Sequence, residues 1–219
     1  MKIEQTQQPL QVLVIGANGG VGRQSVEIGL DAGHHVTALL RDPAKLVLRH
    51  PNLELVQGDI MYPETFERCL ANKDVVISAI GGKMNEPTTL FSLGAINLLK
   101  AMQKMDVKRA FFISSAAIEI SPAQPFYIRL VTKYVVQQLF GLGYADQRIM
   151  EKIIKESDTD WTIMRPPRLT DKPLTGHYRF AINTFLKNCT SISRADVAFF
   201  MVENINNQAA CKATIEIGY

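Results

Sequence analysis

A glycine-rich turn near the amino end of the sequence most strongly constrains the fold. Glycines recur at positions 16, 19 and 22, directly after an apolar run at 11–15 and at the start of a helical pattern. Gly16 permits a tight turn, Gly19 lets the backbone approach a ligand, and Gly22 lets helix and strand pack closely. The free N–H groups and the dipole of the helix favour a bound anion. The segment therefore predicts a strand, a turn and a helix that together hold phosphate.

Short β-prone runs alternate with longer helical patterns over most of the 219 residues. Strands are predicted at 11–15, 35–39, 53–57, 75–79, 110–114, 161–165 and 213–217. Helices are predicted at 20–32, 63–71, 89–105, about 129–157 and 195–204, the last capped by Ser193. This alternation indicates a doubly wound α/β Rossmann fold with about seven parallel strands. We expect residues 1–219 to form one domain.

Two proline-rich segments interrupt the pattern, at 121–125 and 166–176, and both are expected to be loops. They follow the fifth and sixth predicted strands. They should therefore emerge at the carboxyl edge of the sheet, where open α/β folds bind ligands. We expect them to form a small substrate-binding region.

Composition and charge exclude several other classes. The formal net charge of +3 comes from scattered Lys and Arg, without the dense basic patch that nucleic-acid binding needs. Three cysteines, Cys69, Cys189 and Cys211, form no CxxC pair, and no histidine completes a metal-ligand spacing, so no disulfide framework and no metal are expected. The start of the sequence is polar, and no run approaches the roughly 20 apolar residues of a membrane span. The sequence favours a cytoplasmic protein without a membrane partner.

The end of the second strand bears on the choice of nucleotide. An acidic residue about 20 positions past the glycines suits the ribose hydroxyl of NAD, whereas a basic one suits the 2′-phosphate of NADP. Arg41 occupies this place, and a guanidinium holds phosphate through paired hydrogen bonds. NADP(H) is therefore predicted. NAD(H) stays open, because Asp42 can reach a ribose hydroxyl and Arg41 is alternatively a solvated residue that pairs with Asp42.

Further cofactor contacts are expected in the turn and at the strand ends. Asp59 is placed to meet the adenine amino group, with a helix-approach cap as the alternative. The glycine spacing is GxxGxxG, with Asn18 where many dehydrogenases have their second glycine, which is typical of short-chain enzymes. The remaining predicted contacts are Gly20, Val21, Ile60, Ala79, Gly81, Ser114 and Pro166.

Three residues are candidates for acceptor chemistry. Ser115 follows the fifth strand, and Arg168 lies in the loop after the sixth, where a cation can offset negative charge. Tyr144 comes 29 residues after Ser115, but Arg148 stands where a Tyr-x-x-x-Lys pair needs its lysine. That lysine lowers the tyrosine pKa for proton transfer. Tyr144 is therefore more simply a helix or pocket residue than a catalytic acid.

The segments Val14-Ile-Gly-Ala-Asn-Gly-Gly-Val-Gly22, Leu40-Arg-Asp-Pro43, Gly58-Asp59 and Asp160-Trp-Thr-Ile-Met-Arg-Pro-Pro167 resemble one known group. This is the NAD(P)H-binding, NmrA-like group of atypical short-chain dehydrogenase/reductases, and within it the biliverdin-IXβ reductase or flavin reductase branch. The resemblance implies NADPH, reduction of flavins or other planar conjugated acceptors, and Ser115 as the substrate-side serine. Arg168 departs from the histidine of the mammalian biliverdin-reducing members.

Three functions follow as hypotheses. The first is an NADPH-dependent oxidoreductase that transfers hydride to a flavin or similar planar acceptor, with a small molecule as its only partner. The second is a redox sensor that binds NADP(H) without turnover. The third is an epimerase-like sugar enzyme that depends on Tyr144. A monomer or a weak homodimer is expected.

Overall fold

Eight strands form the central sheet of the computed structural model, which describes residues 8–219. The polar start of the sequence lies largely in residues 1–7, outside the described part. The strands are ordered β3 (Leu53–Gln57), β2 (His35–Leu40), β1 (Gln11–Ile15), β4 (Val75–Ser78), β5 (Arg109–Ile113), β6 (Asp160–Arg165), β10 (Ala213–Gly218) and β8 (Arg179–Ile182). All neighbours are parallel except β10 and β8. The predicted Rossmann fold is confirmed.

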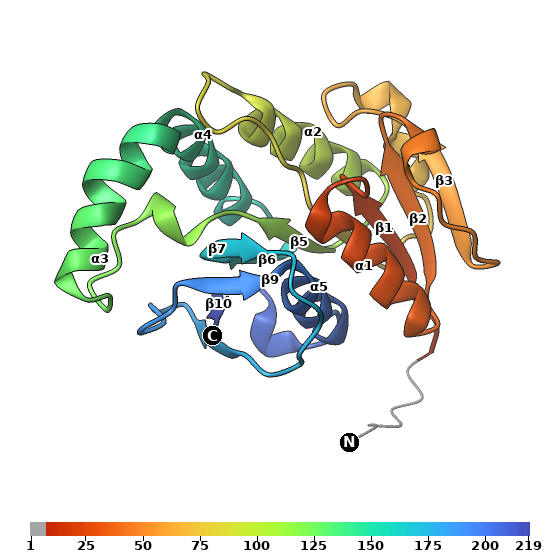
Figure 1. Cartoon of the computed structure of the whole chain (residues 1–219). Coiled ribbons are helices and arrows are strands. Elements are labelled where there is room, and N and C mark those ends of the chain that lie inside the picture. The colour runs from red at the N-terminus through yellow and green to blue at the C-terminus, as the bar shows by residue number, and fades with distance from the viewer. Residues whose placement is uncertain (1–7) are drawn as a thin grey trace.

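Alternation along β1 divides the core into two layers, because successive side chains of a strand point to opposite faces. Val12 and Val14 belong to one buried cluster, and Leu13 and Ile15 to the other. The first face is covered by α1 (Gly20–Asp31) and α5 (Arg194–Glu203), and the second by α2 (Leu90–Lys104) and α4 (Gln137–Lys155) (Figure 1). As predicted, Ser193 caps α5, since its hydroxyl accepts a hydrogen bond from Asp196 N at 2.9 Å.

The prediction of about seven strands missed β8, which pairs antiparallel with β10 at the sheet edge. This strand has four residues, too few for a readable alternation, and its partner is far away in the sequence. The expected loop at 166–176 also contains β7 (Arg168–Thr170), which pairs with β9 (Ser191–Ser193) in a separate small sheet. The loop at 121–125 contains no helix or strand, as predicted.

The helix predicted at 63–71 is instead two short 3₁₀ turns, Pro63–Thr65 and Glu67–Leu70. Phe66 separates them with a non-helical φ of −134°. The Thr65 hydroxyl donates to Tyr62 O at 2.7 Å and accepts from Asp59 N at 3.0 Å, so local bonds compete with a regular helix. The apolar spacing still serves the core, because Phe66 and Leu70 are fully buried.

The long helix predicted from about 129 to 157 consists of three parts. It comprises α3 (Phe126–Val131), a π-helical stretch (Thr132–Val136) and α4. The first two parts and the start of α4 project from the body at the left of Figure 1. None of the helices described here has both the length and the apolar character needed to cross a bilayer.

Candidate functional site

A cavity of about 730 Å³, which we call the large cavity, lies at the carboxyl ends of β1 to β4. The chain order reverses here, with β2 on one side of β1 and β4 on the other, and open α/β sheets bind ligands at such a switch point. Its size suits a cofactor. It is lined by eight residues predicted from the sequence: Gly16, Asn18, Gly19, Arg41, Asp59, Ile60, Ala79 and Gly81.

The glycine turn leaves no space for side chains on its inner side. Gly16 has a φ of +78°, and a β-carbon there would come within 2.6 Å of Ala79 O. A β-carbon on Gly22 would lie 2.2 Å from Gly16 O. Any other residue at this position would therefore clash with the backbone of the turn. Gly19 N donates to Gly16 O at 2.8 Å. Backbone therefore forms the cavity floor, which is the cradle that a pyrophosphate needs.

The amino end of α1 faces this cavity, and no side chain caps its first N–H groups. Gly19 is its N-cap and offers no side-chain cap, and the first turn contains no acidic residue. Asn18 Nδ2 donates to Asp42 O at 3.0 Å and so joins the turn to the end of β2. Val21 and Gly22 are buried in the first turn of α1, behind the cavity surface. The predicted turn thus shapes the cavity mainly through its backbone.

Arg194, at the start of α5, lies beside the glycine turn, a placement that the sequence does not indicate. A β-carbon on Gly20 would lie 2.3 Å from Arg194 Cδ and 2.6 Å from its Nε, so the guanidinium stem crosses the amino end of α1. Arg194 Nη1 pairs with Asp171 Oδ1 at 2.7 Å. This pairing joins positions far apart in the chain, and no local pattern indicates it.

Arg41 and Asp42 at the end of β2 have different surroundings. The Asp42 carboxylate accepts from Ala44 N at 3.2 Å and pairs with Lys45 at 3.7 Å. Arg41 is exposed to solvent, in keeping with the alternative of a solvated residue, but no carboxylate in residues 8–219 pairs with it. A cationic group is therefore available at the cavity edge, while the neighbouring carboxylate is engaged.

Asp59 makes a local turn contact, and its predicted contact with adenine stays a prediction. Its Oδ1 accepts from Met61 N at 3.0 Å, which is a local turn contact. The residue also lines the large cavity, followed by the buried Ile60. Across the cavity, Ala79 contacts the glycine turn, and Gly81 has open space where a side chain would be.

A second cavity, of about 420 Å³, lies at the ends of β5 and β6. All three residues predicted for acceptor chemistry, Ser115, Tyr144 and Arg168, line it. Both predicted loops contribute, through Ser121, Gln124, Pro167 and Arg168, and the projecting helix supplies an apolar wall of Ile128, Val131, Val136 and Phe140. The expected substrate-binding region therefore corresponds to a real cavity.

Tyr144 and Ser115 lie together, but Arg148 is directed elsewhere. Burial raises the pKa of Tyr144, and the neighbouring Ser115 hydroxyl offsets part of this rise. Arg148 Nε and Nη2 donate to Ile118 O at 2.9 and 2.6 Å. Since Arg148 is held by a backbone carbonyl, it does not replace the lysine of a Tyr-Lys pair. Tyr144 therefore stays protonated near neutral pH.

Gln124 presents an unsatisfied acceptor in the second cavity. Its Nε2 donates to Leu186 O and Cys189 O, both at 3.2 Å, and these two bonds fix the orientation of the amide. Its Oε1 is buried and has no hydrogen-bond partner. An orphaned buried acceptor is energetically costly.

Ser114 and Pro166 do not line either cavity. The Ser114 hydroxyl donates to Glu151 Oε1 at 2.7 Å, and Pro166 is buried, with its carbonyl accepting from Ala116 N at 3.0 Å. Their predicted cofactor contacts receive no support from this placement. Ser114 instead belongs to a buried polar network at the ends of β5 and β6.

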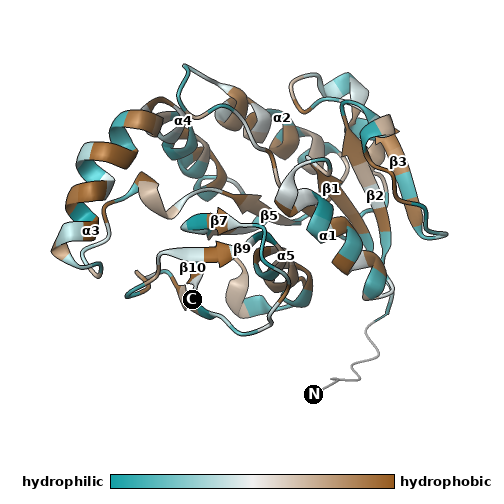
Figure 2. Cartoon of the chain, viewed as in Figure 1, coloured by the Kyte–Doolittle hydropathy of each residue, from teal (hydrophilic) through white to brown (hydrophobic). Residues whose placement is uncertain are grey.

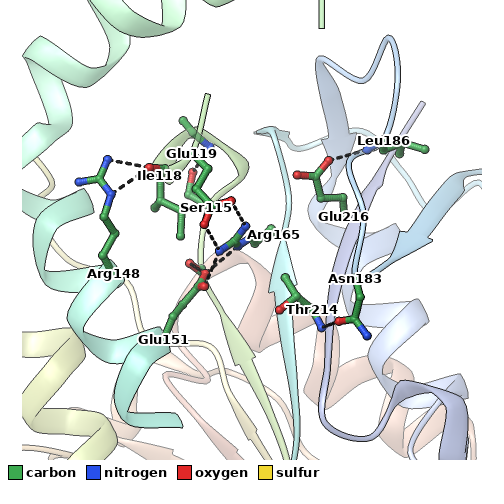
Figure 3. A network of polar contacts seen from close by, with 12 residues as sticks. Ser115, Ile118, Glu119, Arg148, Glu151, Arg165, Asn183, Leu186, Thr214 and Glu216 are labelled. Carbon is green, nitrogen blue, oxygen red and sulfur yellow. Dashed lines mark hydrogen bonds and ion pairs between the residues drawn. The ribbon is translucent and has the colours of Figure 1, made fainter. Parts of the chain in front are cut away.

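Arg165 is the centre of that network (Figure 3). It pairs with Glu151 at 2.6 Å and with Glu119 at 3.0 Å. Burial opposes the charge on Glu151, but the bonds from Arg165 and Ser114 outweigh burial and lower its pKa. Glu216, which accepts from Leu186 N at 2.7 Å, has a pKa raised by burial. The network fixes the floor of the second cavity.

No cluster of metal-ligand residues occurs in the described part of the chain, and its three cysteines are unpaired. Burial raises the pKa of Cys189 to about 11, so this thiol stays protonated. The polar groups that line the large cavity include backbone amides, the Asn18 side chain, the carboxylates Asp42 and Asp59, and the cations Arg41 and Lys45. They fit a phosphorylated nucleotide.

The fold and the glycine cradle define a dinucleotide-binding α/β protein. Residues 16–208 match the NAD(P)H-binding family, and the chain belongs to that family. It is 36% identical over 160 residues to photosystem II assembly factor Ycf39 of Synechocystis, covering 71% of this chain and 44% of that protein. It is 31% identical over 216 residues to an uncharacterized chloroplastic protein of Arabidopsis thaliana, covering 94% of this chain and 76% of that protein.

Among solved structures, the chain is similar to ChuY, an anaerobilin reductase from Escherichia coli O157:H7. The TM-score is 0.76 and the identity 21%, with 95% of this chain and 96% of that chain covered. This likeness shows the shared fold. The chain spans less than half the length of the Synechocystis relative.

Proposed function

We propose that this protein is an NADPH-dependent reductase that transfers hydride to a flavin or similar planar conjugated acceptor. The observation that carries the proposal is the second cavity. It joins the ends of β5 and β6, and one wall is apolar. Its polar lining includes the protonated Tyr144, Ser115, the cation Arg168 and Gln124, beside the paired Arg165 and Glu119. Such a site suits a flat apolar molecule with ring N–H and carbonyl groups.

The large cavity would hold NADPH. The glycine turn and the amino end of α1 receive the pyrophosphate, and Arg194 adds a positive charge beside them. Arg41 binds the 2′-phosphate, because its guanidinium is exposed at the cavity edge and unpaired within the described residues. Asp59 and Ile60 receive the adenine end.

The protein's own contribution to the reaction is alignment and charge. Bound NADPH would supply the hydride, and the oxidised acceptor would take up that hydride together with a proton from solvent. Ser115 orients the acceptor, and Tyr144 donates a hydrogen bond to an acceptor oxygen. Arg168 offsets the negative charge that the acceptor gains. No lysine-activated tyrosine is needed, since alignment of two flat rings accounts for much of the rate.

An acceptor screen tests this proposal. Purified protein is mixed with NADPH or NADH and with FMN, riboflavin, a bilin or a quinone, and nicotinamide oxidation is followed by its absorbance. We expect turnover with NADPH and at least one planar acceptor, and a loss of turnover in Arg168→Ala. Background rates across the whole panel would refute the proposal.

A second candidate is an NADP(H)-binding sensor without turnover. It is supported by the absence of a Tyr-Lys pair and by similarity to a protein named as an assembly factor. NADPH binding without oxidation of any acceptor, together with a partner protein captured only in the presence of the cofactor, would favour it. Brisk turnover would exclude it.

The finer family placement remains part of the proposal. The NmrA-like group and its biliverdin or flavin reductase branch are consistent with the shared fold of the reductase ChuY. An epimerase-like role is less favoured, because the raised pKa of Tyr144 opposes its action as a base. A cytoplasmic location and a monomeric or weakly dimeric state stay predictions.

A further inference from the structure

The segment 126–142, which we call the arm, leaves an unusual amount of apolar surface uncovered. Among the described residues, nine of the seventeen exposed large hydrophobic side chains lie in it: Phe126, Tyr127, Leu130, Val131, Tyr134, Val135, Leu139, Phe140 and Leu142. Single exposed apolar residues are common, but a contiguous group of this kind marks an interaction surface. Figure 2 shows the brown apolar residues on this projecting part.

The arm is apolar on both of its sides. Ile128, Val131, Val136 and Phe140 line the second cavity, while Tyr127, Leu130, Tyr134, Val135 and Leu139 are exposed. None of the residues from 126 to 142 is buried. A helix that is apolar all round is normally covered by other protein or by lipid. The intramolecular contacts described here cover only its inner side.

The charges on the arm indicate whether protein or lipid covers its exposed side. From Ile120 to Ala145 the sequence has two cations, Arg129 and Lys133, and no acidic residue. Lys133 Nζ lies 5.1 Å from the ring centroid of Tyr134, so a cation and an amphipathic aromatic group are adjacent at the surface. Aromatic and aliphatic groups interleaved with cations are typical of helices that lie in the headgroup region of anionic membranes.

A second copy of the chain fits this surface less well. In a symmetric dimer the same patch meets itself, which brings Lys133 and Arg129 toward their own copies. The arm contains no carboxylate to neutralise them. An anionic lipid surface avoids this repulsion and attracts each cation that comes near it.

We propose that the arm docks in the plane of an anionic lipid surface through its exposed apolar side chains and Lys133. The expectation of no membrane partner rested on the lack of a spanning run, which leaves surface docking open. Because the inner side of the arm lines the second cavity, docking would bring that cavity beside the bilayer. An acceptor dissolved in lipid would then reach it, a consequence that rests on the proposed function, whereas the docking itself does not.

Vesicle sedimentation with the full chain, without cofactor or acceptor, tests the docking. Vesicles of phosphatidylcholine alone are compared with vesicles that also contain phosphatidylglycerol. We expect the protein to sediment with the anionic vesicles, less with the neutral ones, and less when salt is added. Failure to sediment with anionic vesicles would overturn the proposal.

Matched variants distinguish vesicle binding through the arm from nonspecific adsorption of exposed apolar residues. Val135→Asp changes an arm residue outside the cavity lining, and Val47→Asp makes the same change at an 86% exposed valine outside both cavities. We expect V135D to lower the bound fraction several-fold and V47D to leave it unchanged. Lys133→Gln should weaken binding to anionic vesicles, and Lys100→Gln, on exposed α2 surface, should not. Equal binding by V135D and V47D would overturn the proposal.

Two further measurements distinguish lipid docking from unfolding of the variants and from association of the chain with itself. Circular dichroism and NADPH affinity should match the parent protein in all four variants, which excludes unfolding as the cause of lost binding. Light scattering measures association of the chain with itself. A dimer that V135D abolishes, combined with no vesicle binding by the parent protein, would assign the arm to a second copy and refute lipid docking.

Discussion

The side chain of Arg194 lies against Gly20, where a β-carbon would come within 2.3 Å of Arg194 Cδ. The first residue of α5 thereby reaches the amino end of α1, the helix packed beside it. Asp171 holds its guanidinium through a contact of 2.7 Å. The guanidinium and its carboxylate partner thus lie beside the turn that is built to receive a pyrophosphate.

Replacement of Arg194 should weaken both nicotinamide cofactors equally. The pyrophosphate is common to NADPH and NADH, so we expect Arg194→Ala to lower both affinities about tenfold, or about 1.4 kcal/mol. Titration calorimetry with each cofactor measures this. Asp171→Ala removes the tether but keeps the cation, and should have a smaller effect. A loss confined to NADPH would contradict this role of Arg194.

Replacement of Arg41 should instead discriminate between the cofactors. We expect Arg41→Ala to lower NADPH affinity about tenfold and to leave NADH affinity within a factor of about two, because only NADPH has the 2′-phosphate. The same calorimetric pair provides the measurement. Equal losses for both cofactors would remove Arg41 from the 2′-phosphate site.

Tyr144→Phe should reduce acceptor turnover only several-fold. The hydroxyl donates a hydrogen bond in the proposed mechanism and does not need to ionise. Because burial raises its pKa, the protonated form persists beyond the usual tyrosine pKa of about 10. The parent protein should therefore show no activity loss from Tyr144 up to that pH. A loss of several thousand-fold in Y144F would instead indicate an essential proton-transfer group.

Asp196 should be a major stability determinant. It accepts hydrogen bonds from Ser193 Oγ at 2.7 Å, Gly176 N at 2.8 Å and Thr175 N at 3.0 Å, which tie the loop before β8 to α5. We expect Asp196→Ala to cost about 2–4 kcal/mol in urea unfolding, since buried donors lose their partner. Asp158→Ala, at an exposed position, should change stability little.

The pH dependence gives an independent check on Asp196. Burial raises its pKa, but bonds from Tyr219, Ser193 and nearby backbone outweigh burial and lower the pKa in the folded state below 3.8. The contribution of Asp196 to stability is therefore complete above its unfolded pKa and is lost as pH falls through the folded value. The difference in unfolding free energy between parent and D196A should shrink in that acid range and stay constant near neutral pH.

Local patterns explain how much of the fold was predictable. The apolar runs that became β1 to β6 and β10 each show their own periodicity, and Gly16 and Gly22 show the turn between β1 and α1. In contrast, β8 exists because Arg179–Ile182 meets the far edge of β10, a pairing that depends on tertiary structure. The π-helical stretch likewise lies within a continuous helical pattern.

The residues of the candidate site likewise fall into those that the sequence indicates and those that only the structure shows. Strand ends place Arg41, Asp59 and Ser115 at one edge of the sheet, and sequence alone indicates those ends. Ser114 differs from Ser115 only by the alternation of the chain, which turns its hydroxyl toward Glu151. Arg194 and Gln124 act through partners distant in the sequence, so their roles emerged only from the structure.

The central claim concerns transfer of hydride from NADPH to a planar acceptor in the second cavity. The most direct measurement is nicotinamide oxidation by the parent protein and by Arg168→Ala, with NADPH and FMN or riboflavin, alongside NADPH binding by calorimetry. The account predicts turnover by the parent protein and a clear loss in R168A, with NADPH affinity unchanged. Tight NADPH binding by both proteins with no oxidation above background would contradict it.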